Sequence, residues 1–147
     1  MFYPDKKFIA SLSEGEKFIF LKIICGVVAV DRKVSREELV YLRELALKYE
    51  VSGDKLSAMI KSSDNAILLK QARMIVDRVK ALALIKDMCM VANLDTDLAD
   101  AEIDYILDVA EAMGIEPRRV QDINAVVNEY LAVSQKAAML LEQEHWS

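Results

Sequence analysis

Residues 24–59 read ICGVVAVDRKVSREELVYLRELALKYEVSGDKLSAM, and residues 88–123 read MCMVANLDTDLADAEIDYILDVAEAMGIEPRRVQDI. The two stretches align without a gap at an offset of 64 residues. Because any two amphipathic helices share an apolar spacing, apolar matches alone would be weak. The aligned stretches also share polar and aromatic residues, which indicates an internal duplication. The identical pairs are Cys25/Cys89, Val27/Val91, Asp31/Asp95, Glu38/Glu102, Tyr41/Tyr105 and Ala46/Ala110.

The first helix of each copy is predicted to lie at the centre of the domain. Residues 14–30 begin with the Ser13 and Glu16 spacing of a capping box and are apolar around nearly the whole helix. Their counterpart, about residues 78–94, has the same character. Cys25 and Cys89 occupy equivalent places on these helices, so we expect buried thiols rather than redox or metalloid chemistry.

The remaining helices follow from caps and apolar spacing. A second helix in each copy begins at the Ser35/Glu38 capping box or its equivalent, and ends near residue 50 or before Gly114. Third helices begin near Ser52 and at Pro117. Outside the copies, short helices are expected over residues 4–11 and 64–74. The apolar spacing after residue 117 fits either one long helix or two helices that break near residue 134.

We therefore expect a compact all-α bundle forming a single domain over residues 1–147, with about seven to nine helices. Four Gly and two Pro are too few for a sandwich or barrel of many short strands. Neither copy alone offers a closed core, so the units are expected to pack about a pseudo-twofold axis. The predicted parts are repeat unit one (about 14–62), a connecting helix (about 64–74), repeat unit two (about 77–127) and a C-terminal helix or tail to residue 147.

Composition and charge exclude several classes of function. The net charge of −5 argues against general nucleic-acid binding, and a single His excludes a His-rich metal cage. Two Cys are too few for a disulfide framework, which favours the cytoplasm. The central apolar stretch, residues 23–30, is far shorter than the ~20 residues of a membrane span. The N-terminal segment lacks the pattern of a signal peptide.

The charges are distributed unevenly along the chain. Residues 1–86 carry a net charge of +5, and residues 87–147 carry −10. Between residues 87 and 117 there are nine carboxylates and no Lys or Arg. Such a block forms a solvated helix face, or it attracts cations or a basic partner.

The repeated motif reads VAVDRKVSREEL at residues 28–39 and ANLDTDLADAEI at residues 92–103. It resembles the two motif copies of the TerB-like tellurite-resistance family, and the resemblance covers about residues 18–123. Related helical modules occur at the N-terminus of some membrane-anchored J-domain co-chaperones. The resemblance implies a compact helical fold and a cytoplasmic bacterial protein. It also implies a role in stress or metalloid resistance through membrane or calcium-linked partners, and no known catalysis.

The motif carboxylates are Asp31 and Glu38 in copy one, and Asp95 and Glu102 in copy two. They act either as structural caps or as oxygen ligands of a hard cation such as calcium, which takes six to eight oxygens. Copy one has basic neighbours, so a salt-bridged turn is expected there. Copy two is the candidate metal site, with the ligands Asp95, Asp97, Asp100 and Glu102.

The sequence shows no nucleophile–base pair and no phosphate loop, so we expect no catalytic residues and no enzyme activity. The first hypothesis is a non-enzymatic TerB-like adaptor in a bacterial stress or tellurite-resistance response. Its partners would be proteins, including membrane-associated ones, and not nucleic acid. The alternative is a divalent-cation-responsive module that uses the turn from Asp95 to Glu102, with calcium as the one candidate cofactor. The oligomeric state stays open.

Overall fold

The computed structural model describes residues 3–31, 33–94 and 99–146. These residues form eight α-helices, one 3₁₀ turn and no strand, which confirms the all-α prediction. The elements, in chain order, are α1 (Lys6–Ala10), α2 (Glu14–Asp31), α3 (Arg36–Lys48), η1 (Gly53–Lys55), α4 (Leu56–Lys61), α5 (Asn65–Arg73), α6 (Arg78–Asn93), α7 (Asp100–Ala112) and α8 (Pro117–Trp146).

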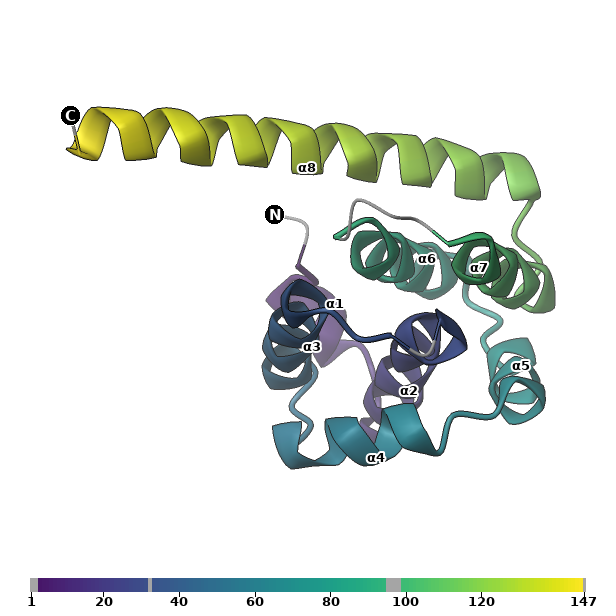
Figure 1. The fold of residues 1–147 in the computed structure, drawn as a ribbon. Helices are drawn as coiled ribbons and strands as arrows, with labels where there is room; N and C mark the ends of the chain where they lie inside the picture. The colour runs from purple at the N-terminus through teal and green to yellow at the C-terminus, as the bar shows by residue number, and fades with distance from the viewer. Residues whose placement is uncertain (1–2, 32, 95–98, 147) are drawn as a thin grey trace.

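Helices α2 and α6 form the centre of the molecule, as their apolar circumference predicts (Figure 1). They contact each other, and the remaining helices surround them: α4, α5 and α7 pack on α2, while α3, α7 and α8 pack on α6. The thiols of Cys25 and Cys89 are buried here, which confirms the prediction. Burial raises the pKa of each thiol to about 12.

Helix boundaries repeat at the offset found in the sequence. Helices α2 and α6 begin 64 residues apart, and so do η1 and α8. Helices α3 and α7 have the same length and both of their ends differ by 64. The starts of these helices and both ends of α3 and α7 are therefore equivalent, whereas α8 continues far beyond the position that matches the end of α4. The twofold axis itself stays a prediction.

The predicted caps account for where several helices start and stop. At the start of α2, the Ser13 N–H donates to Glu16 Oε1 at 2.9 Å, and the Glu16 N–H donates to Ser13 Oγ at 3.1 Å. Asp64 accepts from two backbone N–H groups at the start of α5. Gly114 ends α7 with a φ of 77°, a conformation that glycine adopts without strain.

Gly26 lets α7 approach α2 closely. The ring of Tyr105 lies over this glycine, and its hydroxyl donates to the backbone carbonyl of Ile23 at 2.8 Å. A Cβ at position 26 would overlap the Tyr105 hydroxyl and its ring carbon Cζ. The hydrogen bond between the two repeat units therefore depends on a missing side chain.

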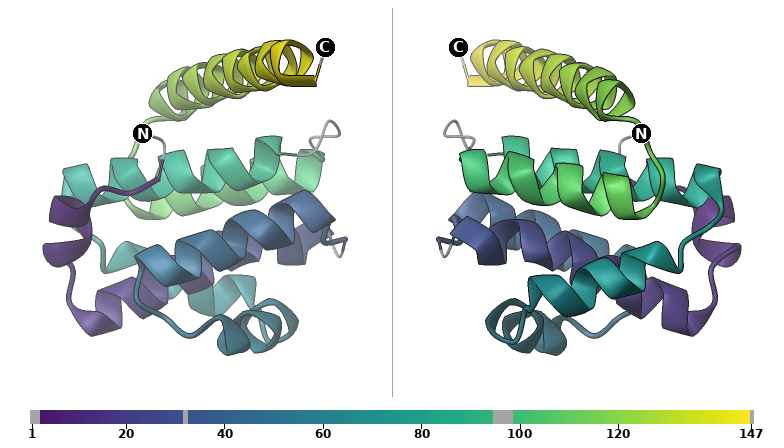
Figure 2. Two further views of the ribbon diagram at one scale, coloured as in Figure 1. Left: turned by 90° about the vertical axis from the view of Figure 1, so that its left-hand side faces the viewer. Right: turned by 90° about the vertical axis from the view of Figure 1, so that its right-hand side faces the viewer.

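Helix α8 is one continuous helix, which decides between the two alternatives for the C-terminal segment. Its first half lies over α6 and α7, and its second half extends past them (Figures 1 and 2). No helix of the described residues is long and apolar enough to cross a membrane.

Replacing Gly26 with Ala should destabilise the protein, although Ala is the better helix former. Overpacking a core typically costs ~1–3 kcal/mol. We expect a clear fall in the urea midpoint of Gly26→Ala, measured by circular dichroism. Gly15→Ala in the same helix is the control, because its nearest neighbour would be 3.9 Å from the new Cβ. Equal midpoints for the two variants would contradict the close approach.

Candidate functional site

Glu38 serves as a helix cap in the first unit. Its Oε1 accepts the Ser35 N–H at 2.8 Å, and its own N–H donates to Ser35 Oγ at 3.1 Å. The side chain is only 3 % exposed, so the carboxylate is held inside the turn between α2 and α3. Asp31 is the last residue of α2 and is half-buried. In this unit the structural role of the motif glutamate is directly visible.

Glu102 occupies the equivalent place in the second unit and makes half of this arrangement. Its Oε1 accepts the Ala99 N–H at 3.3 Å, while Ala99 has no side-chain oxygen to return the bond. Helix α7 begins at Asp100, so Asp100 is the first helical residue and Ala99 holds the N-cap position. Asp95 and Asp97, two of the four candidate metal ligands, lie outside the described residues.

The motif carboxylates that the structure describes, Asp31, Glu38 and Glu102, do not form a metal cluster by themselves. Within residues 3–31, 33–94 and 99–146, no three His, Cys, Asp or Glu side chains are placed to hold one ion. Asp31 and Glu38 therefore gain no third ligand within these residues. A cation at the second turn would need ligands from residues 95–98 together with Asp100 or Glu102.

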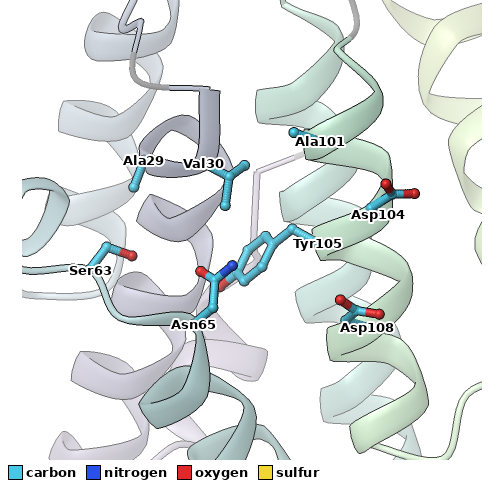
Figure 3. Close-up of a pocket in the computed structure, with 8 residues that line it drawn as sticks. All are labelled: Ala29, Val30, Ser63, Asn65, Ala101, Asp104, Tyr105 and Asp108. Carbon is cyan, nitrogen blue, oxygen red and sulfur yellow. The ribbon is translucent and has the colours of Figure 1, made fainter.

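A cleft of ≈ 480 Å³ lies between α7, the end of α2 and the segment that joins α4 to α5 (Figure 3). Tyr105 reaches from α7 toward Asn65 across the cleft, and Asp104 and Asp108 stand one turn apart on α7. The residues that line it are Ala29, Val30, Ser63, Asn65, Ala101, Asp104, Tyr105 and Asp108.

The cleft is polar and negatively charged. Asp104 and Asp108 are exposed, and none of the lining residues is Lys or Arg. On the opposite wall, Ser63 Oγ is buried and has no hydrogen-bond partner among the described residues. Two carboxylates, a hydroxyl and the Asn65 amide match the donors of an ammonium or guanidinium group. The cleft therefore suits a basic side chain better than an anion or an apolar ligand.

Asp87 is a fully buried carboxylate on the central helix α6. The hydroxyl of Tyr49 donates to its Oδ2 at 2.7 Å, and Lys86 Nζ lies 2.7 Å from its Oδ1. Burial raises the pKa of Asp87, and the Lys86 ammonium and Tyr49 hydroxyl offset this only in part. The charged form is thus costly in the folded protein.

Asp87 stands at the position that matches Ile23 in the other unit. Tyr105 bonds to the Ile23 carbonyl, whereas its counterpart Tyr41 lies close enough to Asp87 for the carboxylate to help raise the Tyr41 pKa. The Tyr41 ring stacks on Tyr3 at 5.2 Å between centroids. The two units therefore use the same tyrosine position against different partners.

Sequence reasoning missed both Asp87 and the cleft. Asp87 is a single carboxylate in an otherwise apolar helix and is matched to an isoleucine, and that mismatch was a usable signal. Asp104 and Asp108 are four residues apart, so they had to share one face of α7. Ser63 and Asn65 gave no signal, because only the folded chain brings them opposite α7.

One comparison with known proteins identifies a family for this chain. A family model described as "Tellurite resistance protein TerB" matches residues 20–125, which is more than half of the chain. The matched region includes both motif copies, the cleft and Asp87. The comparison with curated proteins found no match, and the comparison with solved structures found none either.

The burial of Asp87 should be measurable through the pH dependence of the free energy of unfolding. Its folded pKa is raised above the unfolded value of about 3.9, so the folded state is penalised as pH rises past that value. Asn stays neutral at every pH. The free energy of unfolding of Asp87→Asn, relative to that of the wild type, should therefore increase from pH 4 to pH 7. Each unit of raised pKa corresponds to ~1.4 kcal/mol. Urea denaturation at several pH values measures this difference.

The control for this experiment is Asp54→Asn, because Asp54 is exposed. The pH-dependent gain of Asp87→Asn over the wild type should exceed the change shown by this control. A constant difference between Asp87→Asn and the wild type would mean that Lys86 and Tyr49 compensate the burial of Asp87 in full.

Proposed function

This chain belongs to the TerB tellurite-resistance family, and from that premise we propose that it is a non-enzymatic adaptor that binds a basic segment of a partner protein. The observation that carries the proposal is the cleft beside α7, which Asp104 and Asp108 line together with Ser63 and Asn65. Its donors and charge suit a Lys or Arg side chain, and the carboxylate-rich stretch of residues 87–117 extends the attraction beyond the cleft.

The partner we propose is the cytoplasmic flank of a membrane protein. Such flanks carry an excess of Lys and Arg next to their membrane spans. An acidic, water-exposed cleft attracts these segments without a large apolar interface. This partner also agrees with the membrane-linked role that the family resemblance implies, and it places the adaptor in the cytoplasm.

Removing the cleft carboxylates should weaken binding of a Lys-rich peptide. We expect the double variant Asp104→Asn with Asp108→Asn to lower the affinity about fivefold at low salt. It removes two exposed ion pairs, and each contributes about 0.5 kcal/mol. Fluorescence anisotropy with a labelled peptide measures the change, and raising the salt should reduce it. The control pair is Glu14→Gln with Asp54→Asn, which removes the same charge from two exposed positions elsewhere.

The same variants test the function in cells. A tellurite-sensitive bacterium that lacks its own family member should regain survival on tellurite with the wild-type chain or the control pair. The cleft variant should fail to restore it while accumulating to the same level. Equal rescue by the cleft variant and the wild type would reject the cleft as the adaptor surface.

We keep a cation-responsive role of the second turn as the other candidate function. Its support is the buried Glu102 at the second turn. This turn lies within residues 87–117, a stretch of sequence without Lys or Arg. If calcium binds only the folded state, a free calcium concentration of a hundred times the Kd would raise the free energy of unfolding by ~2.7 kcal/mol.

We expect millimolar calcium to raise the melting temperature more than sodium of matched ionic strength does. Asp95→Asn with Glu102→Gln should abolish this difference, whereas Asp31→Asn with Glu38→Gln should retain it. Identical effects of the two salts on the wild type would remove the cation role and leave the adaptor proposal intact.

A further inference from the structure

Helix α8 carries two apolar stripes. The bundle covers the first, and it covers the second only in part, where the half-buried Ile123 and Tyr130 pack against the core. The first stripe includes Val120 and Val127, which are buried against the body of the molecule. The second lies on an adjacent face and continues into the half of the helix that extends past α6 and α7 (Figure 1). Its members are Ile123, Val126, Tyr130, Val133, Ala137 and Leu140.

The second stripe has the spacing of a coiled-coil seam. Its members follow one another at alternating steps of three and four residues, the a and d pattern of a heptad repeat. Val126, Val133 and Leu140 are 52 %, 65 % and 62 % exposed. A regular apolar seam on an exposed helix face is typical of a helix that pairs with another helix.

We propose that this stripe is the interface between two copies of the chain, whose α8 helices pair in antiparallel orientation. The pattern is complementary to itself in that orientation. When Tyr130 of one copy lies opposite Val133 of the second copy, Val126 meets Ala137 and Ile123 meets Leu140. Each layer then pairs two apolar side chains, and every layer occurs twice.

The charges beside the seam support the same register. Glu129 and Lys136 precede Tyr130 and Ala137 and occupy the same heptad position. Antiparallel pairing brings Glu129 of each copy beside Lys136 of the other copy, giving two complementary pairs. In a parallel pair these two positions would instead face Ser134 and Leu141 of the other copy, so the charge pairs would be lost, and both helical bodies would lie at the same end.

The body of the molecule offers a place for the end of the seam. A hollow of ≈ 490 Å³ lies between α6 and the first half of α8, and Leu82, Ala83, Ile123 and Val126 line it. In the antiparallel register, Leu140 of the second copy reaches Ile123, at this hollow. Since each copy gives and receives the same contacts, the interface closes as a dimer and does not propagate into a fibre.

Two neighbouring substitutions on α8 test the proposal by light scattering after size exclusion. The wild type should have a mass of twice 16.6 kDa at sub-millimolar concentration. Leu140→Glu should give the mass of one chain, whereas Met139→Glu should leave the dimer intact. Met139 is 58 % exposed but lies off the seam, so it controls for the added charge. A monomeric wild type, or equal effects of the two substitutions, would overturn the proposal.

Charge exchange and cysteine pairing test the orientation. Glu129→Lys and Lys136→Glu should each weaken the dimer, and their combination in one chain should restore it. The Val126→Cys and Ala137→Cys proteins are mixed and oxidised. The mixture should give more cross-linked dimer than either variant gives when it is oxidised alone. Efficient cross-linking of Ala137→Cys by itself would indicate a parallel pair and reject the register.

Discussion

The contact between α2 and α6 is the constraint on which the rest of the structure depends. Each of these helices is apolar on nearly all sides, so neither can face water, and each must be enclosed by other helices. One repeat unit supplies too few helices to enclose its own central helix. The second helix of each unit therefore also packs on the central helix of the other unit, through α2–α7 and α3–α6 contacts. Closure of the core requires both units.

Polar groups inside this core fix how the helices are aligned rather than simply adding stability. The Tyr105 hydroxyl finds a backbone carbonyl only because Gly26 leaves room, and Asp87 is held by Tyr49 and Lys86. A buried ion pair contributes little net stability, but a partner removed from it leaves an uncompensated charge. These contacts join α7 to α2 and α3 to α6, so they specify one arrangement of helices that apolar packing alone would leave less defined.

Much of the fold could be predicted from the sequence, because caps and apolar spacing act locally. Ser13, Ser35, Asp64 and Gly114 mark helix ends in the sequence as they do in the structure. The candidate site could be predicted only in part. Asp104 and Asp108 stand on one helix, but the wall formed by Ser63 and Asn65 depends on how α5 packs against α7. Glu102 gave a clear motif signal, yet spacing could not separate a cap from a ligand.

The hydrogen bond from Tyr105 to Ile23 joins residues 82 positions apart, which has a consequence for the order of events during synthesis. A ribosome adds about 5–20 residues each second, so several seconds separate the appearance of these two residues. During that interval α2 has left the ribosome without the helix that covers it. The nascent chain thus exposes its most apolar helix before its core can close, and that interval is when a chaperone is most useful to it.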